Sequence, residues 1–123
     1  MTERIICTSE ALIDGGKGVR CEVRDPQRVG AGETAPAFLI RFRGRAYGYI
    51  NRCGHVPVEL DWEHGEFFDY SRLYLICATH GALYAPETGR CMGGRCNGKG
   101  LQKLTVAEHD GRVFFIEEGK ASG

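Results

Sequence analysis

Two short pairs of cysteine and histidine are the residues of this chain best suited to chemistry. Cys53 and His55 stand two positions apart, Cys77 and His80 stand three apart, and 21 residues separate the two pairs. Thiolates and imidazoles are ligands that proteins offer to zinc, copper and iron. Two of each, delivered from two separate loops, predict a metal centre with four protein ligands.

The order of these ligands along the chain limits which metal the site is expected to bind. Structural zinc sites usually keep like ligands together, with Cys-x2–4-Cys and His-x3–5-His spacing. Here each loop instead pairs one cysteine with one histidine. That pairing suits a [2Fe-2S] cluster with two cysteines on one iron and two histidines on the other. A zinc site, or buried thiols and surface histidines without any metal, are the alternatives.

The residues around both pairs resemble the Rieske [2Fe-2S] domain, in its soluble bacterial ferredoxin branch. The resemblance covers about residues 35 to 118 and has its centre in Cys53-Gly54-His55 and in Cys77-Ala78-Thr79-His80-Gly81. It continues in Asn51-Arg52, Leu60-Asp61-Trp62, Leu75-Ile76, Ala82-Leu83-Tyr84 and Thr88-Gly89. It implies one [2Fe-2S] cluster per chain, ligated by Cys53, His55, Cys77 and His80.

The same resemblance implies a one-electron carrier and its partners. In this branch a flavin-dependent reductase supplies the electron and a terminal oxygenase receives it. The sequence shows no activated nucleophile and no acid/base pair, so we predict no catalytic residues and no enzyme activity of the chain itself. The small Rieske-like subunit of a nitrite reductase and a zinc-binding interaction module are the alternatives. All four ligand positions are present, which favours the carrier over the nitrite reductase subunit.

The charge of such a cluster suits it to one-electron transfer. Two ferric ions, two sulfides and two thiolates sum to zero when both histidines are neutral, whereas four thiolates leave a charge of minus two. Potentials of His-ligated centres accordingly lie at about −150 to +300 mV, against about −400 mV for plant-type ferredoxins. The high-potential branch has extra cysteines where this chain has Val58 and Thr79, and a serine where it has Ala82. We therefore expect a potential toward the low end.

Length and charge exclude several classes of protein. A chain of 123 residues is expected to form one domain, residues 1–123, with a cluster-binding subdomain at about residues 50–88. Its 16 basic and 16 acidic residues give no general case for nucleic acid or an anionic membrane as partner. There is no apolar stretch of membrane-spanning length and no signal-peptide pattern. We expect a cytoplasmic protein.

An acidic segment follows the first Cys/His pair. Residues 59–69 contain five carboxylates and no lysine or arginine. The ordinary interpretation of such a run is a solvated face. The functional alternative is a surface that steers a basic partner toward the cluster.

Short β-prone runs separated by glycines predict an all-β fold. Residues 38–42 and 46–50 flank Arg43-Gly44-Arg45, and residues 104–109 and 112–117 flank Asp110-Gly111, so each set predicts a hairpin. A short run at 73–76 leads into the second Cys/His pair, and residues 9–14 can hold a helical turn or two. The predicted fold class is a small Rieske-type antiparallel β-sandwich or partly open barrel.

The remaining cysteines are expected to be thiols without a role at the metal centre. Cys7 and Cys21 are predicted to be small apolar residues of strands. Cys91 and Cys96 are close enough in sequence to cross-link a turn, but a reducing cytosol favours free thiols.

Overall fold

Three antiparallel sheets make up the described part of the computed structural model, which comprises residues 2–24, 34–52, 59–61, 65–78, 81–94 and 99–117. Sheet A has the strand order β1-β10-β9, sheet B has β2-β3-β4-β8, and sheet C has β5-β6-β7. The strands are β1 (Thr2–Thr8), β2 (Val19–Arg24), β3 (Thr34–Phe42), β4 (Arg45–Ile50), β5 (Leu75–Ile76), β6 (Leu83–Tyr84), β7 (Cys91–Gly93), β8 (Lys103–Leu104), β9 (Val106–His109) and β10 (Arg112–Glu117). The predicted all-β, antiparallel class is confirmed.

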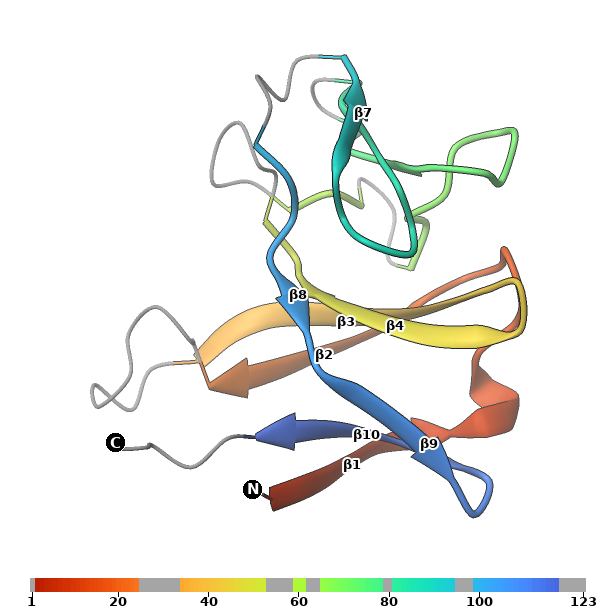
Figure 1. The fold of residues 1–123 in the computed structure, drawn as a ribbon, viewed down its shortest axis with the longest axis vertical. Coiled ribbons are helices and arrows are strands. Elements are labelled where there is room, and N and C mark those ends of the chain that lie inside the picture. Colours follow the sequence, from red (N-terminus) through yellow and green to blue (C-terminus); the bar gives the residue numbers. More distant parts are fainter. Residues whose placement is uncertain are drawn as a thin grey trace.

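Sheet B lies between the other two sheets (Figure 1). Because side chains alternate along a strand, β3 sends Phe38 and Ile40 into one hydrophobic core and Leu39 into another. Leu39 shares its core with Phe115 of sheet A, which makes sheets A and B a sandwich. Phe38 and Ile40 share theirs with Tyr84 of sheet C. Burying a large apolar side chain stabilises the fold by about 1.5–3 kcal/mol, so both interfaces contribute substantially.

The first predicted hairpin is confirmed, with a shorter turn than expected. Arg45 pairs with Phe42 inside the ladder, so only Arg43 and Gly44 form the loop. Both have positive φ, 52° and 83°, which suits the twist of a two-residue hairpin but strains a non-glycine residue. The carboxylate of Asp14 accepts hydrogen bonds from the backbone N–H groups of Arg43 (2.9 Å) and Gly44 (2.7 Å). These bonds offset the strain.

The second predicted hairpin is confirmed at Asp110-Gly111, where φ is 54° and 71°. Its first strand differs from the prediction, because the chain changes sheet at Thr105. β8 pairs with β4 in sheet B, whereas β9 pairs with β10 in sheet A. The segment crosses from one layer to the other and closes one side of the sandwich (Figure 1).

Arg41 fastens the segment after β1 to the sandwich. This segment begins with η1 (Ser9–Ala11), a single 3-10 turn within the predicted range. The guanidinium donates to the backbone oxygens of Leu12 (2.9 Å) and Ser9 (3.1 Å), and it forms an ion pair with Glu108 (2.7 Å). The hydrogen bond from Arg41 lowers the pKa of Glu108.

Sheet C is much smaller than the sandwich sheets. β5 pairs with β6 through Leu75 opposite Tyr84, and β6 pairs with β7. Of the predicted run at 73–76, only Leu75–Ile76 is strand, and Leu73 is 48% exposed. We call the described residues 59–61, 65–78 and 81–94 the small-sheet region. Within the described residues, no helix has the length and apolarity needed to cross a membrane.

Candidate metal centre

Cys77 is the one predicted ligand that lies within the described residues. It directly follows β5, its side chain is buried, and it is not disulfide-bonded. Its N–H donates to the carbonyl of Ala82 (2.9 Å), and its carbonyl accepts the N–H of Gly81 (2.7 Å). These two bonds hold the backbone of Cys77 against Gly81 and Ala82 at the end of a short strand.

The other three predicted ligands, Cys53, His55 and His80, lie outside the described residues. The residues that flank them are described, and they bring the two loops together. The carbonyl of Leu60, which follows the first loop, accepts the N–H of Ala78, next to Cys77, at 3.1 Å. Among the described residues no three His, Cys, Asp or Glu side chains gather as a metal site, which agrees with only one predicted ligand lying there.

Two glycines beside the second loop, Gly81 and Gly94, differ in how closely the described chain packs against them. Gly81 has φ +71°, and a Cβ atom there would meet no atom of the described residues within 4 Å. Gly94 has φ +79°, and a Cβ atom there would lie 2.5 Å from the carbonyl oxygen of Gly81 and 2.8 Å from Cα of Ala82. Gly94 therefore lets the chain after β7 pass directly against Gly81 and Ala82, the two residues that follow His80. Gly94 could not be singled out from the sequence, because only its position in space distinguishes it from other turn glycines.

The acidic segment after the first loop is not a uniformly solvated face. Asp61 is buried, with Arg20 Nε 3.1 Å from its carboxylate, and Glu59 also forms an ion pair with Arg20. The carboxylate of Asp69 accepts hydrogen bonds from Ser71 Oγ (2.7 Å) and the N–H of Arg72 (3.1 Å). Three of the five carboxylates thus have structural partners, which weakens the steering interpretation. The ion pairs of Glu59 and Asp61 could not be predicted from the sequence, because their partner Arg20 is distant along the chain.

The cysteines outside the predicted centre divide into two kinds. Cys7 and Cys21 are half-buried thiols in strands, as predicted, and burial raises the pKa of Cys21 to about 11. With this pKa the Cys21 side chain is almost entirely in the thiol form at neutral pH. Cys91 is disulfide-bonded, with its partner outside the described residues. This corrects the prediction of a free thiol, which rested on the redox compartment and not on the distance between sulfur atoms. Cys96 lies outside the described residues.

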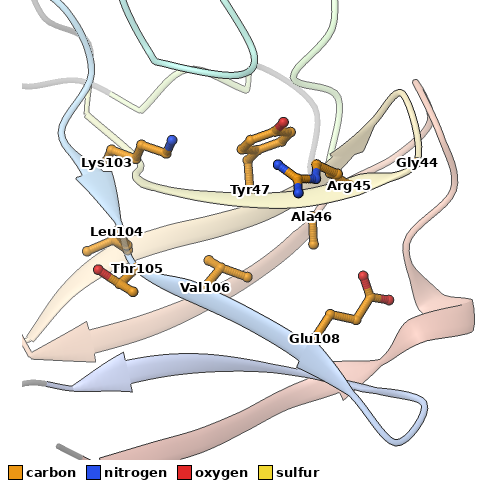
Figure 2. Close-up of a pocket in the computed structure, with 9 residues that line it drawn as sticks. All are labelled: Gly44, Arg45, Ala46, Tyr47, Lys103, Leu104, Thr105, Val106 and Glu108. Carbon is orange, nitrogen blue, oxygen red and sulfur yellow. The ribbon is translucent and has the colours of Figure 1, made fainter.

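A pocket on the sandwich lies along β4 and the β8–β9 segment, and it has no part in the predicted centre. Figure 2 shows Arg45, Tyr47 and Lys103 on one side of β4 and Ala46 on the other. Lys103 Nζ stands 5.3 Å from the centre of the Tyr47 ring. The lining contains no cysteine or histidine, so it offers no ligand of the predicted kind.

The family model of the Rieske [2Fe-2S] domain matches residues 11–112 of this chain. The chain therefore belongs to the Rieske [2Fe-2S] domain family, and membership implies a [2Fe-2S] cluster. The resemblance seen in the sequence is confirmed. The described residues fit such a cluster, because they hold a buried cysteine without a disulfide and, at Gly81, a backbone position where no described atom would lie within 4 Å of a Cβ atom.

Solved structures with a similar fold include several Rieske-type ferredoxins. The ferredoxin of carbazole 1,9a-dioxygenase from Nocardioides aromaticivorans IC177 is 16% identical with a TM-score of 0.69, covering 96% of this chain and 100% of that chain. The ferredoxin of Sphingomonas yanoikuyae B1 is 17% identical with a TM-score of 0.70, covering 95% and 100%.

A third similar chain comes from a complex of reduced oxygenase and oxidised ferredoxin in carbazole 1,9a-dioxygenase. It is 22% identical with a TM-score of 0.68, and the match covers 98% of this chain and 97% of that chain. At such identities these likenesses show the fold alone. The comparison with curated proteins found no significant match.

Proposed function

We propose that this protein is a one-electron carrier that holds one [2Fe-2S] cluster through Cys53, His55, Cys77 and His80. The observation that carries the proposal is the mixed pair of ligands in each of two loops, in a chain of the Rieske family. The hydrogen bond between Leu60 and Ala78 supports it, because it joins the flanks of the two loops. We further propose that the chain is a single domain, with residues 50–88 as its cluster-binding subdomain.

The chain's own residues prepare the site for a metal-bound thiolate. Cys77 is fully buried among apolar side chains such as Leu75 and Tyr84. A metal ion deprotonates a cysteine ligand on binding, so metal uptake would supply the thiolate form of Cys77. Bound there, the cluster supplies one reversible electron, and the chain's part is to hold the ligands and limit the access of water.

The proposed partners are a flavin-dependent reductase as donor and a terminal oxygenase as acceptor. Support for the oxygenase comes from the fold, which is similar to a ferredoxin chain solved in complex with an oxygenase. Support for the reductase comes only from the family resemblance. We propose no catalytic residues in this chain, and a cytoplasmic location remains a prediction that cell fractionation tests.

The proposal is tested on protein reconstituted anaerobically with iron and sulfide. We expect two irons and two labile sulfides per chain, visible absorption that dithionite bleaches, and a paramagnetic reduced state. Cys77→Ser should lose this signal, whereas Cys21→Ser, a matched change of a half-buried cysteine in β2, should keep it. A colourless protein with stoichiometric zinc would overturn the proposal, and co-purification with a sirohaem subunit would favour the nitrite reductase alternative.

A further inference from the structure

Asn51 closes the loop that carries the first two proposed ligands. It directly follows β4 and precedes Cys53 by two residues, and its side chain is buried. Its Oδ1 accepts the N–H of Leu60 at 2.8 Å, and its Nδ2 donates to Oδ1 of Asp61 at 3.0 Å. These partners leave one orientation of the amide, because Leu60 offers a donor and Asp61 an acceptor. One side chain thus joins both ends of the loop.

Asp61 continues this connection into the sandwich. Its side chain is fully buried, and its second oxygen accepts the N–H of Gly65 at 3.0 Å. Arg20 of β2 places Nε 3.1 Å from the same oxygen, although this N–H is not aligned for a hydrogen bond. A buried carboxylate is costly without a nearby cation, so the charge of Arg20 is what makes Asp61 tolerable there.

Leu60 links this arrangement to the second loop. Its N–H is held by Asn51, and its carbonyl accepts the N–H of Ala78, beside Cys77. Asn51 is itself anchored to sheet B, since its N–H donates to the carbonyl of Pro36 at 2.8 Å. A continuous path of hydrogen bonds therefore runs from sheet B through Asn51 and Leu60 to the residue next to Cys77.

We infer that Asn51 and Asp61, with Arg20 as counter-ion, are positioning residues that set the separation of the two ligand loops. We call these three residues the loop clamp. The inference rests on the proposed function, because it assumes that the two loops ligate one cluster. Its consequence is that the loop clamp governs how long the cluster is retained and the electronic surroundings of its irons. Groups that hydrogen-bond directly to metal ligands typically alter metal affinity about 10- to 100-fold when they are changed, and the loop clamp acts one bond further away, through Leu60 and Ala78.

Exchanging the side chains of Asn51 and Asp61, singly and together, tests the loop clamp. Asn51→Asp places two carboxylates face to face, and Asp61→Asn places two amide donors face to face or removes the acceptor for Gly65. The double variant Asn51→Asp/Asp61→Asn restores a donor opposite an acceptor at every hydrogen bond, but it does not restore the ion pair between Asp61 and Arg20. We expect each single variant to lose its cluster to an iron chelator up to about tenfold faster than the wild type. We expect the double variant to recover part of that loss.

The matched control is Asp14→Asn. Asp14 also holds a turn through two backbone N–H groups, but it does so in the sandwich at Arg43 and Gly44. The Asp14→Asn variant should have a lower free energy of unfolding than the wild type but the same rate of cluster loss from the folded protein. The electron paramagnetic resonance spectrum of the reduced protein is the second readout. We expect it to change in the single variants, to return toward the wild type in the double variant, and to be unchanged in Asp14→Asn.

The outcomes separate this inference from the proposed function. A wild-type protein that takes up no cluster would overturn the proposed function itself. A wild type that holds a cluster, with single variants matching Asp14→Asn in both rate and spectrum, would overturn the loop clamp alone. If the single variants do not fold, Arg20→Gln applies the same test from β2, where part of the side chain is exposed. It should accelerate cluster loss, and an unchanged rate would contradict the inference.

Discussion

The three longest ladders of the sandwich hold many residue pairs, whereas those of the small-sheet region hold few. β1–β10, β2–β3 and β3–β4 each pair six residues. The two ladders of sheet C each pair two. In their place, the small-sheet region uses side chains that bond to backbone, such as Asn51 with Leu60 and Asp69 with Arg72. Backbone ladders tolerate most side chains, so the sandwich is expected to be robust to substitutions that the small-sheet region does not tolerate.

Gly94→Ala should have the largest effect. The new methyl group would lie 2.5 Å from the carbonyl oxygen of Gly81, in a backbone conformation that already disfavours alanine. We expect a loss of about 3 kcal/mol or more of unfolding free energy and little bound cluster. Denaturant unfolding and iron content measure the two effects.

The control is Gly111→Ala in the sandwich, at φ +71°, where no atom of the described part of the chain lies within 4 Å of the new methyl group. It should cost only the conformational penalty of about 1–2 kcal/mol and leave iron content unchanged. Equal effects of the two variants would contradict the contrast between the regions.

Tyr49→Phe should have the next largest effect, because it breaks a bond between the two regions. The Tyr49 hydroxyl, on β4, donates to the carbonyl of Pro86 at 2.6 Å, and the side chain is fully buried. Phenylalanine would leave that carbonyl without this donor, at a cost of about 1–3 kcal/mol. Thermal unfolding followed separately in the far ultraviolet and in cluster absorption shows whether the small-sheet region now melts first. Coincident transitions would mean that the regions still unfold together.

Glu108→Gln should have a smaller effect, confined to the sandwich. It removes the charge that pairs with Arg41 at 2.7 Å but keeps a hydrogen-bond acceptor. Both side chains are partly exposed, so we expect a loss of about 1 kcal/mol or less. Denaturant unfolding at neutral pH measures it. A changed rate of cluster loss would show that the sandwich transmits strain to the small-sheet region.

The smallest expected effect is a pH dependence at the edge of sheet A. Hydrogen bonds to Glu3 (2.9 Å) and Asp110 (3.0 Å) raise the pKa of His109. Because the pKa is higher in the folded state, this stabilisation is complete below the unfolded pKa of about 6.5 and is lost as pH rises through the folded value. Glu3→Gln should therefore lower the urea midpoint at acidic pH and leave it unchanged at alkaline pH. An equal shift of the urea midpoint at acidic and at alkaline pH would mean that the effect comes from packing and not from the charge of His109.

Local chemistry explains what could be predicted from the sequence. The Asp110-Gly111 turn and the Arg43-Gly44 turn were found because both require residues with positive φ between β-prone runs. The single helical turn at Ser9–Ala11 could likewise be predicted from the sequence. The change of sheet at Thr105 was not, because it depends on which strand each half of the segment meets in space.

By itself the sequence determined the family, the all-β class, and the two loops expected to carry ligands, since ligand types and turn residues act over a few neighbouring positions. Only the tertiary structure decided that Asp61 is buried against Arg20 and that Gly94 lies against Gly81. Each of these contacts joins residues that are distant along the chain. Their partners become identifiable only when burial and close approach force particular atoms together.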